Sequence, residues 1–377
     1  MIPFNKPFIA GNEINNIKKS FSSGKISGDG VNSIKCHNFF KKKYDFKHNY
    51  LTTSCTDALE MAAILLNLSH NDEVIMPSYT FVSTANPFVL RGAKIKFVDS
   101  QINHPNIDHT QIECLITKKT KAIVIVHYAG IACDIDFILK ICKKYNIALI
   151  EDCAHSVDSY YKNKPLGSFG LMSAFSFHET KNISAGEGGL LVVNSQKLCN
   201  RAEIIREKGT NRSAFFRGDV DKYTWVDIGS SFLPSDITSA ILYSQLQNLN
   251  KIQKKRTAIF NGYNQNLSEK LALKNILTPS IPEFATNNGH MFYLVCRDQI
   301  ETTRLINFLR KNKIYAVSHY ISLHSSRYFK DYHDGRELPN SDNFTKCLVR
   351  LPFFFELTNK EIDYISKKVI SFFNLIN

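Results

Sequence analysis

The chain has 377 residues, of which 44% are hydrophobic, so it can bury a large core and form a second, smaller domain. No apolar run is as long as a membrane span, no signal-peptide pattern opens the chain, and nine scattered cysteines predict reduced thiols, so we expect a cytoplasmic protein without a metal site. The formal net charge is +13, but the basic residues are spread along the chain without interleaved aromatic residues, so we expect neither a nucleic-acid nor a membrane partner.

Residues 48–195 alternate short apolar runs with helical patterns, which predicts a mostly parallel sheet covered by helices on both faces. Sheets of this kind place their functional sites at the carboxyl ends of the strands, and His127 and Asp152 both lie at such ends. The predicted strands cover residues 51–53, 73–76, 94–98, 122–126 and 147–150, and the predicted helices cover residues 57–66 and 134–145.

Residues 205–236 show little periodicity and are rich in arginine, lysine and aromatic residues, so we expect a long functional loop there. From about residue 237 onward helical patterns dominate, and their mixture with short strand-like runs predicts a smaller α/β domain. We therefore expect a large domain over residues 1–240 and a small C-terminal domain over residues 241–377. The later strand-like runs cover residues 290–295 and 316–320, and the later helices cover residues 301–312 and 359–373.

A lysine and an aspartate stand where pyridoxal phosphate (PLP) chemistry needs them. Lys181 follows the alternating run Phe175-Ser176-Phe177-His178, which predicts a part-buried strand end, and burial lowers the pKa of a lysine and favours Schiff-base formation. Asp152 ends an apolar run, where a carboxylate can hold the pyridine nitrogen of the cofactor protonated. Taken singly, Lys181 could be a surface lysine and Asp152 a helix cap, so the hypothesis depends on the pair.

A phosphate site is predicted at the turn Ser54-Cys55-Thr56-Asp57-Ala58, which leads from a strand into a helix. Backbone N–H groups at a helix N-terminus bind phosphate, and a hydroxyl such as that of Ser176 can add to them. Phe81 is a candidate to stack on the cofactor ring, with a core aromatic as the alternative. His155, three residues after Asp152, could contact the ring hydroxyl or support the carboxylate.

Taken in order, these motifs resemble the sugar-nucleotide aminotransferases of the DegT/DnrJ/StrS family over nearly the whole chain. The resemblance implies an α/β protein of PLP-dependent transferase fold type I, the aspartate-aminotransferase-like fold, with PLP as its cofactor. Within the family, residues 206–212, 221–225, 227–236 and 319–324 are most similar to members that form dTDP-4-amino-4,6-dideoxygalactose. The motifs that carry the family resemblance are Ser54-Cys55-Thr56, Pro77-Ser78-Tyr79-Thr80-Phe81, His127-Tyr128-Ala129-Gly130, Glu151-Asp152, Ser176-Phe177-His178-Glu179-Thr180-Lys181-Asn182 and Gly186-Glu187-Gly188-Gly189.

The resemblance also implies a role for each matching residue. Lys181 would hold the cofactor as a Schiff base and later move the proton, and Asp152 would pair with the pyridine nitrogen. Cys55, Thr56 and Ser176 would hold the cofactor phosphate. The remaining implied contacts are Phe81, His155 and Ser231 on the cofactor, and His178, Arg212, Arg217, Tyr223, His319 and Tyr320 on the substrate.

Two positions depart from the family pattern. Ser231 stands where many members place an asparagine on the phosphate bound by the neighbouring subunit, and its side chain is shorter. His155 stands where many members have glutamine, and both side chains can form hydrogen bonds. Because Arg212, Arg217 and Tyr223 are expected to reach the sugar nucleotide across a subunit interface, the resemblance implies a homodimer with shared active sites.

The activity that the resemblance implies is transamination of dTDP-4-keto-6-deoxy-D-glucose by L-glutamate. The products would be 2-oxoglutarate and dTDP-4-amino-4,6-dideoxy-D-galactose, for lipopolysaccharide or enterobacterial common antigen. A gluco-forming 4-aminotransferase and a 3-aminotransferase on a related keto sugar are the alternatives. The dehydratases of the family replace the Schiff-base lysine with histidine, so Lys181 argues against them. A non-catalytic regulator that binds nucleic acid belongs to another class, and the presence of Lys181 and Asp152 speaks against it.

Overall fold

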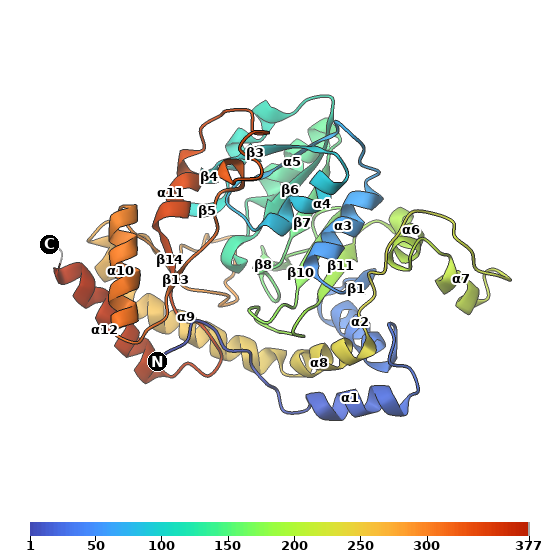
Figure 1. Cartoon of the computed structure of the whole chain (residues 1–377), viewed down its shortest axis with the longest axis horizontal. Coiled ribbons are helices and arrows are strands. Elements are labelled where there is room, and N and C mark those ends of the chain that lie inside the picture. The colour runs from blue at the N-terminus through green and yellow to red at the C-terminus, as the bar shows by residue number, and fades with distance from the viewer. Residues whose placement is uncertain (376–377) are drawn as a thin grey trace.

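The computed structural model describes residues 1–375, and its centre is a seven-stranded sheet (Figure 1). Only β11 runs against the other strands of this sheet, so the prediction of a mostly parallel sheet is confirmed. From one edge to the other the strands are β1 (Asn49–Thr52), β11 (Gly189–Val193), β10 (Met172–Ser176), β7 (Ala148–Asp152), β6 (Thr120–Val126), β2 (Glu73–Pro77) and β3 (Lys94–Val98).

Helices cover both faces of the sheet because successive strand residues point to opposite faces and both sets are apolar. In β6, Ile123 and Ile125 pack into one core, and Ala122 and Val124 pack into the other. The first core is closed by α2 (Val31–Tyr44), α5 (Ile135–Tyr145) and α8 (Asp236–Gln247), and the second by α3 (Cys55–Leu65), α4 (Asn86–Leu90) and α6 (Gln196–Arg206). Helix α1 (Glu13–Ser22) packs on α8.

A small C-terminal domain has its own sheet and its own apolar core. The sheet has the order β12 (Tyr293–Val295), β14 (Leu348–Arg350) and β13 (Val317–Ser318), with antiparallel pairing. Its helices are α10 (Gln299–Lys311), α11 (Pro339–Cys347) and α12 (Asn359–Leu375). The predicted later helices and strand-like runs are thus present, although the strands are shorter than predicted.

The long helix α9 (Leu249–Ala272) joins the two domains (Figure 1). Its residue Ile252 belongs to a core of the large sheet, and Ile259 belongs to the core of the small domain. The division at residue 240 stays a prediction, and this packing supports a passage between the domains inside α9. No helix among residues 1–375 is long and apolar enough to cross a membrane.

Residues 205–236 differ in part from the predicted loop. They include the end of α6, a short helix α7 (Arg212–Arg217) and the start of α8, and α7 projects from the body of the molecule in Figure 1. We call residues 207–231 the arm. The remaining short elements are β4 (Ser100–Gln101), β5 (His104–Ile107), β8 (Tyr160–Tyr161), β9 (Lys164–Pro165) and the 3-10 turns Val82–Thr84, His109–Gln111, Glu113–Leu115, Tyr128–Gly130 and Leu323–Ser325.

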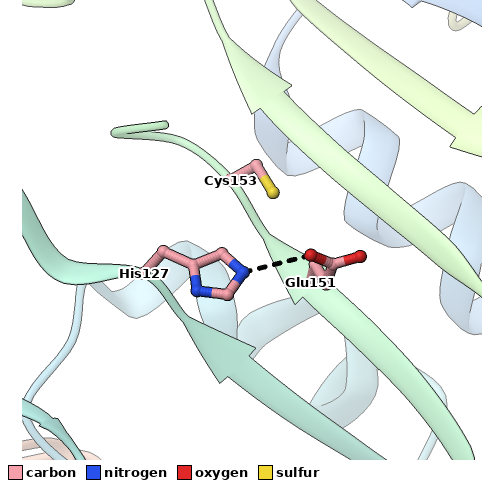
Figure 2. A group of neighbouring side chains, drawn as sticks. All are labelled: His127, Glu151 and Cys153. Atoms are coloured by element: carbon pink, nitrogen blue, oxygen red, sulfur yellow. Dashed lines mark hydrogen bonds and ion pairs between the residues drawn. The ribbon is translucent and has the colours of Figure 1, made fainter. Parts of the chain in front are cut away.

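His127, Glu151 and Cys153 form a buried cluster at the carboxyl ends of β6 and β7 (Figure 2). Their potential ligand atoms lie within 4.8 Å of one another, a spacing that a metal ion could use. However, His127 Nδ1 accepts the N–H of Cys133 at 3.2 Å, so its ring proton lies on Nε2 and is donated to Glu151 Oε2 at 3.1 Å. Burial also raises the pKa of the Cys153 thiol well above its ordinary value. We therefore interpret the cluster as structural.

The Glu151 carboxylate holds the segment that leads into β10. It accepts hydrogen bonds from the backbone N–H groups of Gly167 at 2.9 Å, Phe169 at 2.8 Å and Gly170 at 2.7 Å. With His127, four donors thus share one fully buried carboxylate, whose charge is compensated by hydrogen bonds alone. Because Asp152 is the next residue, this network also fixes the end of β7.

We expect Glu151→Ala to lower the free energy of unfolding by about 3 to 5 kcal/mol, because four donors, three of them in buried hydrogen bonds, lose their acceptor. Glu151→Gln, which keeps an oxygen acceptor, should cost less. Urea denaturation followed by far-UV circular dichroism measures both. The control is Glu283→Ala, whose side chain is exposed and should change the free energy by less than about 0.5 kcal/mol. A Glu151→Ala variant as stable as this control would contradict the interpretation.

Candidate active site

A cavity of about 440 Å³ opens at the carboxyl ends of the parallel strands, between the large sheet and the small domain. Its volume falls within the range of ordinary ligand sites, about 300 to 1,000 Å³. From the large domain it is lined by Ser54, Cys55, Thr56, Leu59, Thr80, Phe81, Ser83, Thr84, Val126, Asp152, Ala154, His155, Ser176, His178, Thr180, Lys181 and Glu187. From the C-terminal part it is lined by His290, His319, Tyr320 and Arg350.

Lys181 lies in a tight turn that follows β10. Its backbone N–H donates to the carbonyl of His178 at 2.9 Å, which closes the turn and aims the side chain into the cavity. Burial lowers the pKa of Lys181 to about 8, and the positive charge of Arg350 also lowers it, whereas Cys55 and Asp152 act in the opposite direction. The predicted part-buried lysine with a lowered pKa is therefore present.

Asp152 ends β7 in the same cavity as Lys181. Burial raises the pKa of the Asp152 carboxyl group, and hydrogen bonds from Thr84 Oγ1 at 2.8 Å and from the N–H of Ala154 at 3.1 Å counteract this effect. Both donors favour the ionised form and leave the carboxylate facing the cavity. Thr84 was not predicted, because nothing in its local sequence distinguishes it from any turn threonine.

The N-terminus of α3 forms one wall of the cavity. Ser54 caps the helix by accepting the N–H of Asp57 at 3.0 Å, and no partner among the described residues takes the N–H groups of Cys55 and Thr56. A Cβ atom on Gly189 would lie 2.3 Å from the carbonyl oxygen of Ser54, so only glycine allows this approach. The result is a cradle of free N–H groups beside the hydroxyls of Thr56 and Ser176, which suits a phosphate.

Three imidazole rings line the side of the cavity nearest the small domain. The rings of His155 and His290 stack at 4.3 Å, and His319 stacks on Tyr320 at 3.5 Å. Burial lowers the pKa of all three histidines well below the ordinary value, so they are neutral at neutral pH. His155 accepts a hydrogen bond from the N–H of Ala129 through Nδ1 at 3.3 Å, and its Nε2 lies 3.3 Å from the Tyr320 hydroxyl. The hydrogen bonds to the Asp152 carboxylate come from Thr84 and Ala154 instead.

The rim of the cavity carries Phe81 and His178. The Phe81 side chain is 54% exposed and its ring lies 5.9 Å from that of Tyr320, so it is no core aromatic and is free to cover a ligand. His178 Nδ1 forms a hydrogen bond with Thr180 Oγ1 at 3.0 Å, and His178 Nε2 lies 3.6 Å from Glu187 Oε1. Their predicted ligand contacts stay predictions.

Four predicted site residues lie on the arm and outside this cavity. Arg217 pairs with Glu203 at 2.8 Å and with Asp219 at 3.0 Å, and the exposed Arg212 lies 5.1 Å over the Phe216 ring. The remaining two, Tyr223 and Ser231, are exposed. In a single chain these residues do not meet Lys181, and their roles stay predictions.

PLP fits the residues that line the cavity. Lys181 supplies an amine with a lowered pKa, Asp152 supplies a carboxylate in the same cavity, and the α3 cradle supplies free N–H groups for a phosphate. These are the groups that an aldehyde, a pyridinium nitrogen and a phosphate ester require. His290 and Arg350 also line the cavity but were not predicted. In the sequence, the signal that could have indicated Arg350 as a site residue is its charge within the apolar run 348–351.

Solved structures with this fold include several aminotransferases. Spr1654 from Streptococcus pneumoniae, solved in its PMP-form, is 24% identical with a TM-score of 0.92, and the match covers 100% of both chains. PseC from Helicobacter pylori, an aminotransferase of pseudaminic acid biosynthesis, is 24% identical with a TM-score of 0.87 over 99% of both chains. CalS13 from Micromonospora echinospora, a sugar aminotransferase, is 21% identical with a TM-score of 0.89, over 98% of this chain and 100% of CalS13. These likenesses confirm the predicted fold class.

Sequence comparison goes further than the fold. The uncharacterized protein MJ1066 from Methanocaldococcus jannaschii is 32% identical over 98% of this chain and 97% of its own. The profile of the DegT/DnrJ/EryC1/StrS aminotransferase family matches residues 7–370. Because this match spans nearly the whole chain and the cavity holds the predicted lysine and aspartate, the protein is an aminotransferase that belongs to the DegT/DnrJ/EryC1/StrS family.

Proposed function

We propose that the protein transfers the amino group of L-glutamate to C4 of dTDP-4-keto-6-deoxy-D-glucose, with PLP as cofactor. The products are dTDP-4-amino-4,6-dideoxy-D-galactose and 2-oxoglutarate, made in the cytoplasm for lipopolysaccharide or enterobacterial common antigen. The observation that carries transamination is that Lys181 and Asp152 share one cavity with the α3 cradle. The choice of sugar rests on the sequence resemblance of residues 206–236 and 319–324.

Different side chains of this cavity would perform different steps of amino transfer. When bound, PLP supplies an electron sink that stabilises negative charge on the substrate carbon. Asp152, which accepts hydrogen bonds from Thr84 and Ala154, would pair with the pyridine nitrogen and favour its protonated form. Lys181 Nζ then takes the proton from the α-carbon of glutamate and later delivers a proton to C4 of the sugar. A pKa of about 8 suits both directions of transfer near neutral pH.

We propose that the arm completes the site of a second subunit in a homodimer. The arm exposes large aromatic side chains, with Phe216 69% exposed and Trp225 79% exposed, which is unfavourable for an isolated chain. Arg212 and Arg217 on the same arm would supply positive charge for the diphosphate of the sugar nucleotide. The sugar ring would then bind in the cavity between the two domains.

The sugar product tests the proposed reaction. Purified protein with PLP, L-glutamate and dTDP-4-keto-6-deoxy-D-glucose should form an amino sugar whose proton NMR spectrum has the small H3–H4 coupling of a galacto sugar. A large coupling would identify the gluco epimer, and an amine on C3 of a 3-keto substrate would identify the other alternative. Absence of turnover with this dTDP sugar, while glutamate still aminates the cofactor, would contradict the proposed sugar and leave transamination standing.

The reactivity of Lys181 should depend on pH as a lysine with a pKa of about 8, because burial disfavours its charged form. The neutral amine is the reactive form, so its rate of acylation should rise with pH, reach half of its maximum near pH 8 and level off above. An uncharged acylating reagent and peptide mass spectrometry on the cofactor-free protein measure this rate. A rate that still rises steeply above pH 10 would mean that Lys181 is solvated like an ordinary lysine.

A mixed dimer tests the shared site. One subunit carries Lys181→Ala, the other carries Arg212→Ala with Arg217→Ala, and each parent dimer should be nearly inactive. If the arm serves the opposite subunit, one of the two sites contains only wild-type residues, so the purified mixed dimer should regain about half of the wild-type rate. If each chain builds its own site, the mixed dimer stays inactive, and this result would contradict the proposal. Lys222→Ala on the same arm is the matched control in place of the arginine pair.

A further inference from the structure

His290 is a cavity residue whose two ring nitrogens are in different states. Its Nδ1 lies 2.8 Å from Asn182 Oδ1. The amide of Asn182 has only one possible orientation, because its Nδ2 lies 2.9 Å from the backbone carbonyl of Asn288, which can only accept. Asn182 Oδ1 is therefore the acceptor, and His290 Nδ1 carries a proton. Burial lowers the pKa of His290 well below its ordinary value, so the ring is neutral and Nε2 has a free lone pair.

This Nε2 atom is a hydrogen-bond acceptor without a donor. His290 is buried and lines the cavity, and no donor among residues 1–375 forms a hydrogen bond with its Nε2. Polar atoms in buried side chains are almost always hydrogen-bonded in folded proteins. We therefore look for an N–H or O–H group that reaches this atom during the reaction.

The position of His290 is fixed by α9 and by the turn of Lys181. Arg256 donates through Nε to the carbonyl of Gly289 at 2.9 Å and through Nη2 to the carbonyl of His290 at 2.8 Å. Gly289 has a φ of +59°, and a Cβ atom there would lie 2.7 Å from the backbone of Arg256, so this close approach needs glycine. Asn182 Nδ2 also donates to Gln253 Oε1 at 3.0 Å. The imidazole is thus held in one place and one tautomer before any ligand binds.

Lys181 is the donor that the fold brings to this acceptor. It directly precedes Asn182, so the side chain that fixes the His290 ring also anchors the turn of the lysine. Within the described part of the chain, no hydrogen bond or ion pair occupies Lys181 Nζ. Burial has the largest effect on the pKa of His290, and among the lysine and arginine side chains that lower it further, Lys181 has the greatest effect.

Arg350 is the other cation of the cavity, but it is less able to reach His290. Its guanidinium carbon lies 4.7 Å from the centre of the Phe4 ring, which covers one face of the group. The side chain of a lysine has a flexible four-carbon stem and a compact amino group with rotatable donors. Lys181 can therefore turn between the reacting atoms and His290.

We propose that His290 is a positioning residue for Lys181: its Nε2 accepts a hydrogen bond from Lys181 Nζ whenever the lysine is not bonded to the cofactor. Asn182 keeps the imidazole in the tautomer that can accept. A neutral amine has two hydrogens and one lone pair, so an N–H held at His290 directs the lone pair away from the ring, where it can take the proton of the substrate carbon. Nζ then becomes an ammonium group that keeps this hydrogen bond, while His290 stays neutral and takes no proton. The proposal rests on the proposed transamination through Lys181 but not on the identity of the sugar.

The cofactor-free protein tests this hydrogen bond without turnover. In His290→Leu the ammonium form of Lys181 loses its acceptor, so the pH of half-maximal acylation of Lys181 should fall by about 0.5 to 1 unit. His290→Gln, whose amide oxygen can accept, should stay within about 0.3 unit of the wild type. If His290 only filled space, its loss would admit water and raise the half-maximal pH. An unchanged or raised value in His290→Leu would overturn the proposal. The titratable groups that act on Lys181, which are Cys55, Asp152 and Arg350, are the same in all variants.

The two half-reactions test whether His290 serves Lys181 or one of the substrates. In the holoenzyme, the reaction with L-glutamate is followed by the loss of the visible absorbance of the lysine-bound cofactor, and the reaction with the keto sugar by its return. Because Lys181 moves the proton in both, His290→Leu should slow both by a similar factor, on the order of 10- to 100-fold. His290→Gln should recover to within about 5-fold of the wild type. A fall confined to one half-reaction would mean that Nε2 contacts that substrate, and this result would overturn the proposal.

An isotope effect separates misplaced proton transfer from weaker binding. With glutamate deuterated at the α-carbon, His290→Leu should show a larger isotope effect than the wild type, because proton transfer becomes slower than the other steps. Asn182→Ala releases the His290 ring from its tautomer and should reproduce the acylation shift of His290→Leu, and an unshifted value would contradict the role of Asn182. Far-UV circular dichroism establishes that each variant is folded, and His290→Leu decides the case if Asn182→Ala is unfolded. The matched control, His70→Leu, removes an exposed histidine outside the cavity and should change neither measurement.

These measurements keep the new role apart from the proposed function. If glutamate aminates the wild-type enzyme but the dTDP sugar does not react, the proposed sugar fails, and the acylation profile and the donor half-reaction still decide the role of His290. If glutamate does not react with the holoenzyme, the proposed transamination fails, and the acylation profile alone decides whether His290 holds Lys181.

Discussion

The parallel pairing of β7 with β10 is the contact on which the cavity depends. In its register Asp152 lies beside Ala174, two residues before the end of β10 and the turn that carries Lys181. Because the two strands run in the same direction, their carboxyl ends meet at one edge, and two distant parts of the sequence face one cavity. The reversed strand β11 then places Gly189 between Thr52 and Ser176, which brings the start of α3 to the same edge.

Electrostatic balance in the cavity depends on groups that ligands must complete. Lys181 has a lowered pKa, the three histidines of the cavity are neutral, and Arg350 has no carboxylate partner among the described residues. Burial raises the pKa of the Asp152 carboxyl group, and the hydrogen bonds from Thr84 and Ala154 and the charge of Lys181 counteract this effect. Such a site is tuned to bind phosphate and carboxylate groups, since it gains hydrogen bonds and charge neutralisation only when they arrive.

The sequence was sufficient for the sheet, its parallel direction and the Lys181–Asp152 pair, because continuous apolar strands and strand-end polar residues follow from local patterns. The sequence could not predict the reversed direction of β11, because an apolar strand has the same residue pattern in a parallel and in an antiparallel pairing. The short helix α7 was not predicted, because its six residues show too little periodicity to distinguish a helix from a loop. Thr84 and Arg350 were not predicted for another reason. They reach the cavity only through long-range packing, which brings β14 and a turn after β2 to the same cavity as Asp152 and Lys181.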